Sequence, residues 1–254
     1  MNDSGHVAFW AALVNDSGLP FALGPQGIWA EDAGRNLQLI ARSGAGNVPG
    51  AIDANFERFA LALEHNNQGQ VAFLARLEEG VGGITSDNRD GIWMTAPNGT
   101  LIQVVREGIG GVPGLPGANF YFDIFHYDYT LNNVGMLAFS AWLSQPASAF
   151  DPRDGIWVAK GPAPVEVVRV GQVVAGRTVD GISRFTELND MGQVLYHATY
   201  AEGGSGYHLW TPTLRFTPQG TNLGNWIQTE NWTFGLAPAH VHPVGGGPHV
   251  AQQL

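Results

Sequence analysis

One short stretch decides the fold of this chain: Asn66-Asn67-Gln68-Gly69-Gln70-Val71-Ala72-Phe73. Variants of it begin at residues 2, 132 and 189, so the copies follow one another at spacings of 64, 66 and 57 residues. The first and third variants keep the pattern Asn-x-x-Gly-x-x-Ala-Phe, whereas the fourth ends in Leu195-Tyr196. Self-similarity at a period of this size is the signature of repeat architectures, so the sequence predicts a tandem array.

Further landmarks follow each copy in a fixed order. A Gly-Ile-Trp triplet occurs at 27–29, 91–93 and 155–157, and His208-Leu209-Trp210 is a weaker fourth copy. A branched segment that ends in arginine comes next, then a Gly-containing turn, and then an aromatic segment. Short branched or aromatic runs bounded by Gly, Asn, Asp and Pro are typical of β-strands, and no segment shows the apolar spacing of a helix. Each unit therefore accounts for four strands.

The strands do not alternate apolar and polar residues, which indicates burial on both faces. Four-stranded sheets that stack in this way around an axis form a propeller. The sequence thus predicts an all-β, β-propeller-like array of four repeats of about 57–66 residues in a single domain, 1–254. The expected repeat units are 1–65, 66–131, 132–188 and 189–240, followed by a tail at 241–254.

The first unit starts at its Asn turn and so lacks the aromatic strand that precedes this turn in later units. Residues 225–234 contain Asn-Trp-Ile and Asn-Trp-Thr-Phe, where the next aromatic strand is due. We expect this C-terminal strand to join the first unit and close the ring. The alternative is that the chain is a fragment of a longer array.

Composition limits the classes of partner. The 254 residues are 44% hydrophobic and only 13% charged, with a net charge of −10. An acidic chain without a basic stripe does not favour nucleic acid as a partner. The chain has no cysteine, so thiolate chemistry and disulfides are excluded. It also has no apolar run approaching 18 residues, so no membrane span is expected. Residues 6–14 are apolar but lack a basic flank, and we interpret them as a strand, not a signal peptide.

The repeated motif resembles that of the bacterial NxxGxxAF tandem-repeat proteins, the "choice-of-anchor" family. The resemblance spans residues 1–216 and includes the Gly-Ile-Trp, Arg-x-Gly and Pro-Gly landmarks. It implies an extracellular or cell-surface protein held by a C-terminal sorting signal, and it implies no particular reaction. From the sequence we expect neither a leader nor an anchor in residues 1–254.

The least repeat-like stretch is residues 121–129, where acids and a histidine join several aromatic residues. On a strand, His126 and Asp128 share one face, because side chains alternate. Such a mixture suits sugar binding or acid–base work. The alternative is an aromatic edge strand with solvated acids. The candidate ligand-binding residues are Tyr121, Asp123, His126, Tyr127 and Asp128.

Two loops carry paired aspartates before the Gly-Ile-Trp strand: Asp87 with Asp90, and Asp151 with Asp154. Carboxylates on a Gly-terminated turn can bind Ca²⁺, but their number falls short of the six to eight oxygens that calcium prefers. The alternative is that these aspartates shape the turns. No other cofactor is indicated.

The repeated tryptophans and arginines fit packing and loop bracing better than a ligand site. We therefore interpret the chain as an extracellular or cell-surface interaction module that binds a glycan or a protein partner through its loops. One alternative is a secreted carbohydrate-active or other hydrolytic enzyme with its site near residues 123–128. A second alternative is a structural spacer or assembly subunit. The sequence does not define the oligomeric state.

Overall fold

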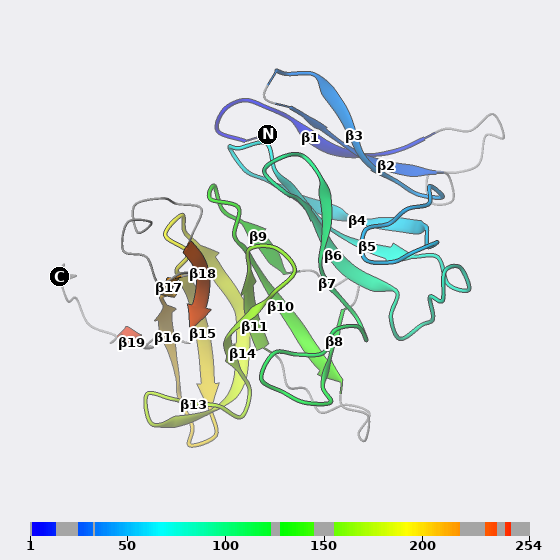
Figure 1. Ribbon diagram of the computed structural model, residues 1–254. Helices are drawn as coiled ribbons and strands as arrows, with labels where there is room; N and C mark the ends of the chain where they lie inside the picture. Colours follow the sequence, from blue (N-terminus) through cyan, green and yellow to red (C-terminus); the bar gives the residue numbers. More distant parts are fainter. Residues whose placement is uncertain are drawn as a thin grey trace.

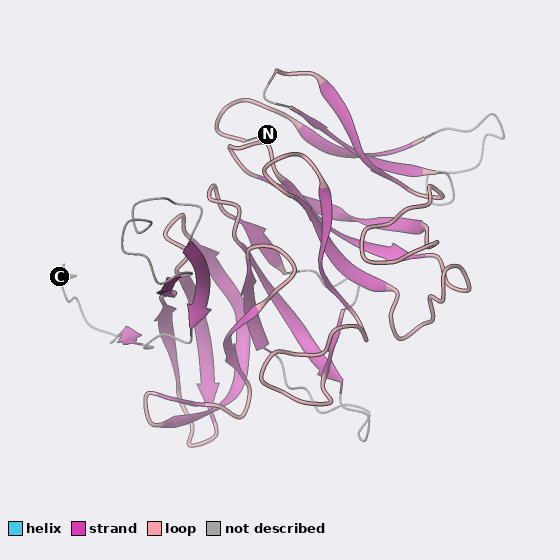
Figure 2. Cartoon of the chain, viewed as in Figure 1, coloured by secondary structure: helices cyan, strands magenta, loops and turns pink. Residues whose placement is uncertain are grey.

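The computed structural model of the chain describes residues 2–13, 25–32, 34–122, 128–144, 155–218, 232–237 and 242–244. Throughout these residues the secondary structure consists of strands and loops (Figure 2). The predicted all-β class is therefore confirmed. Within this described part, no helix is long and apolar enough to cross a membrane.

The first two antiparallel sheets contain three and four strands, in the orders β1-β2-β3 and β4-β5-β6-β7. The strands of the first sheet are β1 (Ala8–Ala12), β2 (Gln26–Glu31) and β3 (Leu37–Arg42). Those of the second are β4 (Phe56–His65), β5 (Val71–Leu77), β6 (Asp90–Thr95) and β7 (Leu101–Arg106).

The third sheet has the order β12-β11-β10-β8, with β9 also paired to β10, and the fourth has the order β13-β14-β15-β16-β19. The third comprises β8 (Asn119–Tyr121), β9 (Tyr129–Leu131), β10 (Leu137–Ser144), β11 (Gly155–Ala159) and β12 (Val165–Arg169). The fourth comprises β13 (Val173–Val174), β14 (Arg177–Leu188), β15 (Val194–Tyr200), β16 (Ser205–Trp210) and β19 (His242–Val244). A separate two-stranded ribbon pairs β17 (Thr213–Pro218) with β18 (Trp232–Ala237).

The spacing of glycine and tryptophan in Gly-Ile-Trp follows from close packing along one strand. Residues two apart on a strand share a face. In β6 the indole of Trp93 lies over Gly91, where an added Cβ would sit 3.0 Å from the ring. The rings of Trp29 and Trp157 approach Gly27 and Gly155 more closely still. A larger residue at the glycine would displace the tryptophan.

Each Asn-x-x-Gly segment forms a tight turn that its own asparagine organises. Asn66 Oδ1 accepts hydrogen bonds from the backbone N–H groups of Gln68 and Gln70, at 3.1 and 2.9 Å. Gly69 has φ +79°, a left-handed conformation that favours glycine. Side-chain acceptance of backbone N–H groups is the usual role of Asn in turns. The motif thus encodes a hairpin turn, here between β4 and β5.

The same asparagines also connect successive repeats, in a series that we call the Asn ladder. The Nδ2 groups of Asn2, Asn66 and Asn132 each donate to the backbone carbonyl of the matching asparagine in the next repeat. The three bonds are Asn2 to Asn66 at 2.8 Å, Asn66 to Asn132 at 2.9 Å and Asn132 to Asn189 at 2.8 Å. The ladder fixes every turn against its neighbour and explains why the motif recurs.

The sheets form a row (Figure 1). Three clusters of buried apolar side chains lie between neighbouring sheets. We call the face of a sheet that turns toward the preceding sheet its leading face, and the opposite face its trailing face. In the core between the first two sheets, Ile28 and Ala30 come from the trailing face of the first sheet. Phe73 and Trp93 come from the leading face of the second sheet. Alternation along buried strands thus fills two cores at once, which explains the lack of polar positions.

The predicted ring closure is wrong for the described residues, and they form no closed propeller. Among the described strands, the C-terminal strand β18 pairs with β17, whereas β1 pairs with β2. The first sheet and the C-terminal strands lie at opposite ends of the row (Figure 1). Residues 225–231 lie outside the described part. Pairing with the nearby β17 closes a much shorter loop than a return to β1, so its entropic cost is lower.

Candidate functional site

An exposed aromatic pair lies on the third sheet and includes Tyr121, one of the predicted ligand-binding residues. Tyr121 of β8 lies opposite Trp142 of β10. Their ring centroids are 5.7 Å apart and their planes differ by 27°, so the rings are stacked. Tyr121 is 45% exposed and Trp142 37%. Large aromatic side chains at this exposure are the usual anchors of binding surfaces.

Asp128 borders the same strand. Its carboxylate Oδ2 accepts a hydrogen bond from Ser140 Oγ at 3.3 Å, and its carbonyl accepts one from the Ser140 N–H at 2.9 Å. Ser140 and Trp142 are two residues apart on β10 and therefore share a face. Tyr121 and Asp128 thus both contact β10, Tyr121 at Trp142 and Asp128 at Ser140. The predicted residues Asp123, His126 and Tyr127 lie outside the described residues.

Trp142 was not among the predicted site residues, although the repeat contained a signal for it. The first and second units have Ala12 and Arg76 at the corresponding position, three residues after the motif phenylalanine. An aromatic residue that appears in one repeat only is not explained by the packing that all repeats share. Its stacking on Tyr121 depends on the pairing of β8 with β10, which the sequence did not reveal.

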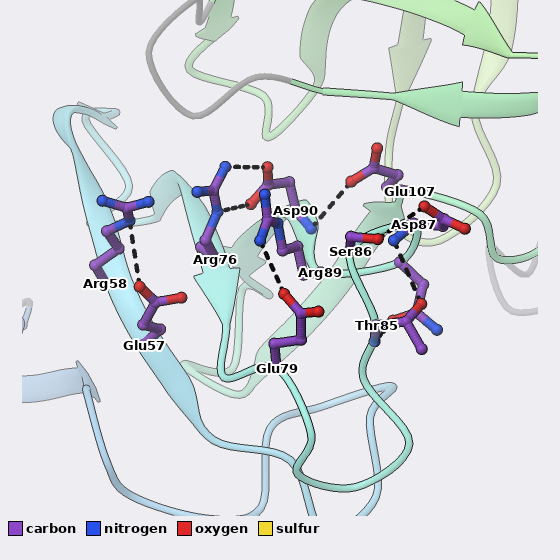
Figure 3. A network of polar contacts seen from close by, with 11 residues as sticks. Glu57, Arg58, Arg76, Glu79, Thr85, Ser86, Asp87, Arg89, Asp90 and Glu107 are labelled. Atoms are coloured by element: carbon purple, nitrogen blue, oxygen red, sulfur yellow. Dashed lines mark hydrogen bonds and ion pairs between the residues drawn. The ribbon is translucent and has the colours of Figure 1, made fainter. Parts of the chain in front are cut away.

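A buried polar cluster lies in the second sheet, at Arg76, Asp90 and Glu107 (Figure 3). Arg76 Nε donates to Asp90 Oδ1 and Arg76 Nη2 donates to Asp90 Oδ2, both at 2.7 Å. Asp90 is 2% exposed and Arg76 8%. Bidentate pairing of this kind is the strongest arrangement available to an arginine and a carboxylate. Neither the first unit, with Ala12 and Gln26, nor the third, with Trp142 and Asp154, repeats it.

Glu107 is the unusual member of this cluster because it is an acidic residue that is only 3% exposed and, among the described residues, has no arginine bonded to it in the way Asp90 has. The Asp90 N–H donates to Glu107 Oε2 at 3.4 Å, and the Glu107 N–H donates to the Asp90 carbonyl at 2.9 Å. Burial, and then the negative charge of Asp90, raise the pKa of Glu107 to about 8, against the opposing effects of Arg89 and Arg76. A carboxyl group in this environment is neutral at pH 7.

The raised pKa of Glu107 makes the stability of the protein pH-dependent. The folded state keeps a proton that the unfolded state releases above pH 4.5, so this contribution falls as pH rises from 4.5 to about 8. The Glu107→Gln variant lacks this titration. We expect it to gain about 1–3 kcal/mol of unfolding free energy over the wild type near the upper end of this window. Urea denaturation of both proteins across the window measures the difference.

Glu79→Gln is the matched control, because Glu79 pairs with Arg89 in the same network but its side chain is 54% exposed. This variant removes one carboxylate from the same network without touching Glu107, so the pH-dependent gain of Glu107→Gln should be absent from it. A Glu107→Gln difference that does not vary with pH in this window would contradict the raised pKa.

The two predicted calcium-binding aspartates of the second unit, Asp87 and Asp90, have different hydrogen-bond partners. Both carboxylate oxygens of Asp90 are occupied by Arg76. Asp87 is exposed, and its Oδ1 accepts a hydrogen bond from Ser86 Oγ at 3.0 Å. Within the described residues, no group of three His, Cys, Asp or Glu side chains is placed to hold a metal ion. Asp151 and Asp154 lie outside these residues, so calcium binding there stays a prediction.

A row of antiparallel sheets, connected by hydrogen bonds between the repeated asparagine turns, defines this chain as an all-β tandem-repeat protein. Comparison with family models then places it more specifically. A family described as "Family of unknown function (DUF7453)" matches residues 1–109 and 112–223, and the chain belongs to it. The break between the two matched stretches falls in the connection between β7 and β8. None of the curated proteins with which the chain was compared matches it.

This assignment corrects the resemblance to the NxxGxxAF family. The motif itself is present, but it encodes an asparagine-organised turn followed by a doubly buried strand. Stacked hairpins of different families can share that local solution, because it follows from turn geometry and burial. The motif therefore predicts the structure of a repeat better than it identifies the family.

Proposed function

We propose that this protein is an interaction module that binds a glycan at the exposed Tyr121–Trp142 pair. The observation that carries the proposal is the stacked, exposed pair itself, at a position where the other described repeats have no aromatic partner. Aromatic faces bind the apolar C–H faces of sugar rings, and a few polar groups around them give orientation. Asp128, whose carboxylate accepts a hydrogen bond from Ser140, two residues before Trp142 on β10, is our candidate acceptor for sugar hydroxyl groups.

The charge of the protein narrows the class of glycan. At a net charge of −10, the chain repels sulfated and other polyanionic polysaccharides. Neutral hexose or pentose polymers fit the aromatic pair without this penalty. Such polymers are displayed at cell surfaces and in the extracellular space, so this location is part of the proposal. Fractionation of the native source is its separate check.

The binding test is a titration of the purified protein against a panel of neutral polysaccharides, with Trp142→Ala as the variant. Loss of a hot-spot aromatic is expected to weaken binding at least about 10-fold, because truncation of such anchors costs more than 1 kcal/mol. Isothermal titration calorimetry on the best polysaccharide measures the change.

Tyr207→Ala is the matched control, since Tyr207 is 52% exposed on the fourth sheet. It should leave binding unchanged. The proposal fails if no neutral glycan binds, or if Trp142→Ala and Tyr207→Ala have equal effects.

The second candidate function, an assembly subunit, is favoured by a different observation. An apolar face of the first sheet is exposed, although the later sheets bury their corresponding faces. Contiguous exposed apolar surface on a protein of this size usually marks an interaction site.

A further inference from the structure

The leading face of the first sheet is open. Its centre is a cross-strand row in which Phe9 lies opposite Trp29 and Trp29 lies opposite Leu39. Phe9 is 39% exposed and Leu39 53%. In the second sheet the corresponding aromatic residues, Phe73 and Trp93, are both 0% exposed. The same type of surface is therefore buried on the second sheet and exposed on the first.

The array itself shows what this type of surface binds. Three times in succession, a leading face is covered by the trailing face of the preceding sheet. In the first of these interfaces, the Trp93 Nε1–H also donates to the carbonyl of Pro49, at 3.1 Å. Within the array, the partner of a leading face is thus always the trailing face of another sheet of the same repeat type.

Among the described residues, the Asn ladder runs from Asn2 to Asn189, and its two terminal members are complementary. Asn2, Asn66 and Asn132 are buried with their side chains directed to the next repeat, whereas Asn189 is exposed. Among the described residues, the Asn189 Nδ2 group donates within its own turn, to Gln193 Oε1 at 2.8 Å. The fourth repeat thus presents a ladder donor, and the first repeat presents the Asn2 carbonyl as an acceptor.

We propose that the leading face of the first sheet binds the fourth repeat of a second copy of this chain, so that copies associate head to tail. In this interface Asn189 of one copy donates to the Asn2 carbonyl of the other, and the apolar row at Phe9 packs on the trailing face of the fourth sheet. That face presents Tyr207, which is 52% exposed. The interface continues the one that already joins the repeats, and it does not depend on the glycan proposal.

A second row of hydrogen bonds supports the same pairing. The backbone N–H groups of Asp3, Asn67 and Asn133 each donate to the side chain of the following repeat. These bonds run from Asp3 to Asn67 at 2.8 Å, from Asn67 to Asn133 at 2.9 Å and from Asn133 to Asp190 at 2.8 Å. Head-to-tail docking extends this row from the Asp190 N–H to the Asp3 carboxylate of the second copy. A face-to-face pair would instead bring two acceptor ends together.

Salt should strengthen this association. Each copy carries a net charge of −10, and Asp3 and Asp190 both lie at the docking ends. Screening of this repulsion favours contact between like-charged copies, while the apolar contacts are unaffected. An interface held by opposite charges would weaken under the same conditions.

The first experiment is sedimentation velocity of the whole chain over a concentration series at low and high salt. It measures the self-association constant of the wild type at each salt concentration.

Two variants test the two surfaces of the proposed interface. Leu39→Arg places a charge on the open leading face and is expected to weaken association at least about 30-fold, as a hot-spot loss would. Asn189→Asp keeps the turn acceptor but removes the ladder donor, and about a 10-fold loss is expected. Leu61→Arg, at a position 71% exposed on β4, is the matched control and should associate like the wild type.

Mixing the two variants distinguishes head-to-tail docking from every other pairing. Leu39→Arg keeps an intact tail and Asn189→Asp an intact head, so an equimolar mixture should form a heterodimer of wild-type affinity and nothing larger. Normal self-association by Asn189→Asp alone, with none by Leu39→Arg, would establish face-to-face pairing and overturn the proposal. A wild type that stays monomeric at millimolar concentration and high salt would also overturn it. Circular dichroism melts confirm that both variants are folded.

Discussion

Replacement of Trp93 with alanine is expected to lower the free energy of unfolding by about 3–5 kcal/mol, the range for truncating a buried tryptophan. Trp93 is 0% exposed in the core between the first two sheets. Its ring packs edge-on against Phe56, with centroids 5.1 Å apart, and its Nε1–H donates to the Pro49 carbonyl. Truncation leaves a cavity and removes this hydrogen bond. Urea denaturation, with the slope compared between variants, measures the loss.

Trp29→Ala is the control that separates burial from residue type. Trp29 has the same place in the repeat and stacks on Phe9, but it lies on the open leading face and is only half-buried. We expect it to cost about 1–2 kcal/mol, because less surface is removed from water in the folded state. If both variants lose the same unfolding free energy, burial by the neighbouring sheet does not determine how much the tryptophan stabilises the protein.

The local structure of the repeat could be predicted because its signals are short-range. Asn66 organises the turn within four residues, and Trp93 requires Gly91 two residues before it. The strands were equally predictable, since a run such as residues 71–77 is apolar enough to be buried on both faces. Each of these features depends on contacts within one hairpin, and a single sequence records such contacts directly.

Features that depend on contacts between repeats were predicted less well. The expected ring required residues 225–234 to return to β1, a choice between long-range pairings that local pattern does not settle. The fourth repeat shows a subtler difference. Tyr196 lies opposite His208 and not Trp210, so His208 has the place that tryptophan occupies in earlier sheets. The pairing register sets that position, and the order of landmarks in the sequence does not reveal it.

The candidate sites show the same limit. Tyr121 and Asp128 were identified because their segment departs from the repeat, but Trp142 required knowledge of the strand opposite Tyr121. Asp90 attracted notice as a possible calcium ligand, whereas its actual partner, Arg76, comes from the neighbouring strand β5. Composition shows which residues are unusual for their repeat. Only the register shows which of them meet.

Replacement of Arg76 with methionine is the second large effect expected, a loss of about 3–5 kcal/mol of unfolding free energy. Methionine preserves much of the side-chain volume but removes the charge that compensates Asp90. The Asp90 carboxylate, 2% exposed, would then be buried without its bidentate partner and next to Glu107. An unpaired buried charge carries its full desolvation cost, so the loss exceeds the value of the ion pair itself.

Two further variants test whether that cause is correct. Arg89→Met breaks the Arg89–Glu79 pair, whose side chains are 30% and 54% exposed, and should cost less than about 1 kcal/mol. The double variant Arg76→Met/Asp90→Leu removes both charges and should regain most of the stability that Arg76→Met loses, because no uncompensated carboxylate remains. If the double variant is as unstable as the sum of its single variants, packing and not the unpaired charge accounts for the effect. A recovered double variant would show that the second sheet retains this polar cluster at no net gain in stability, which would direct the search for its role toward Glu107 and the proton that it holds.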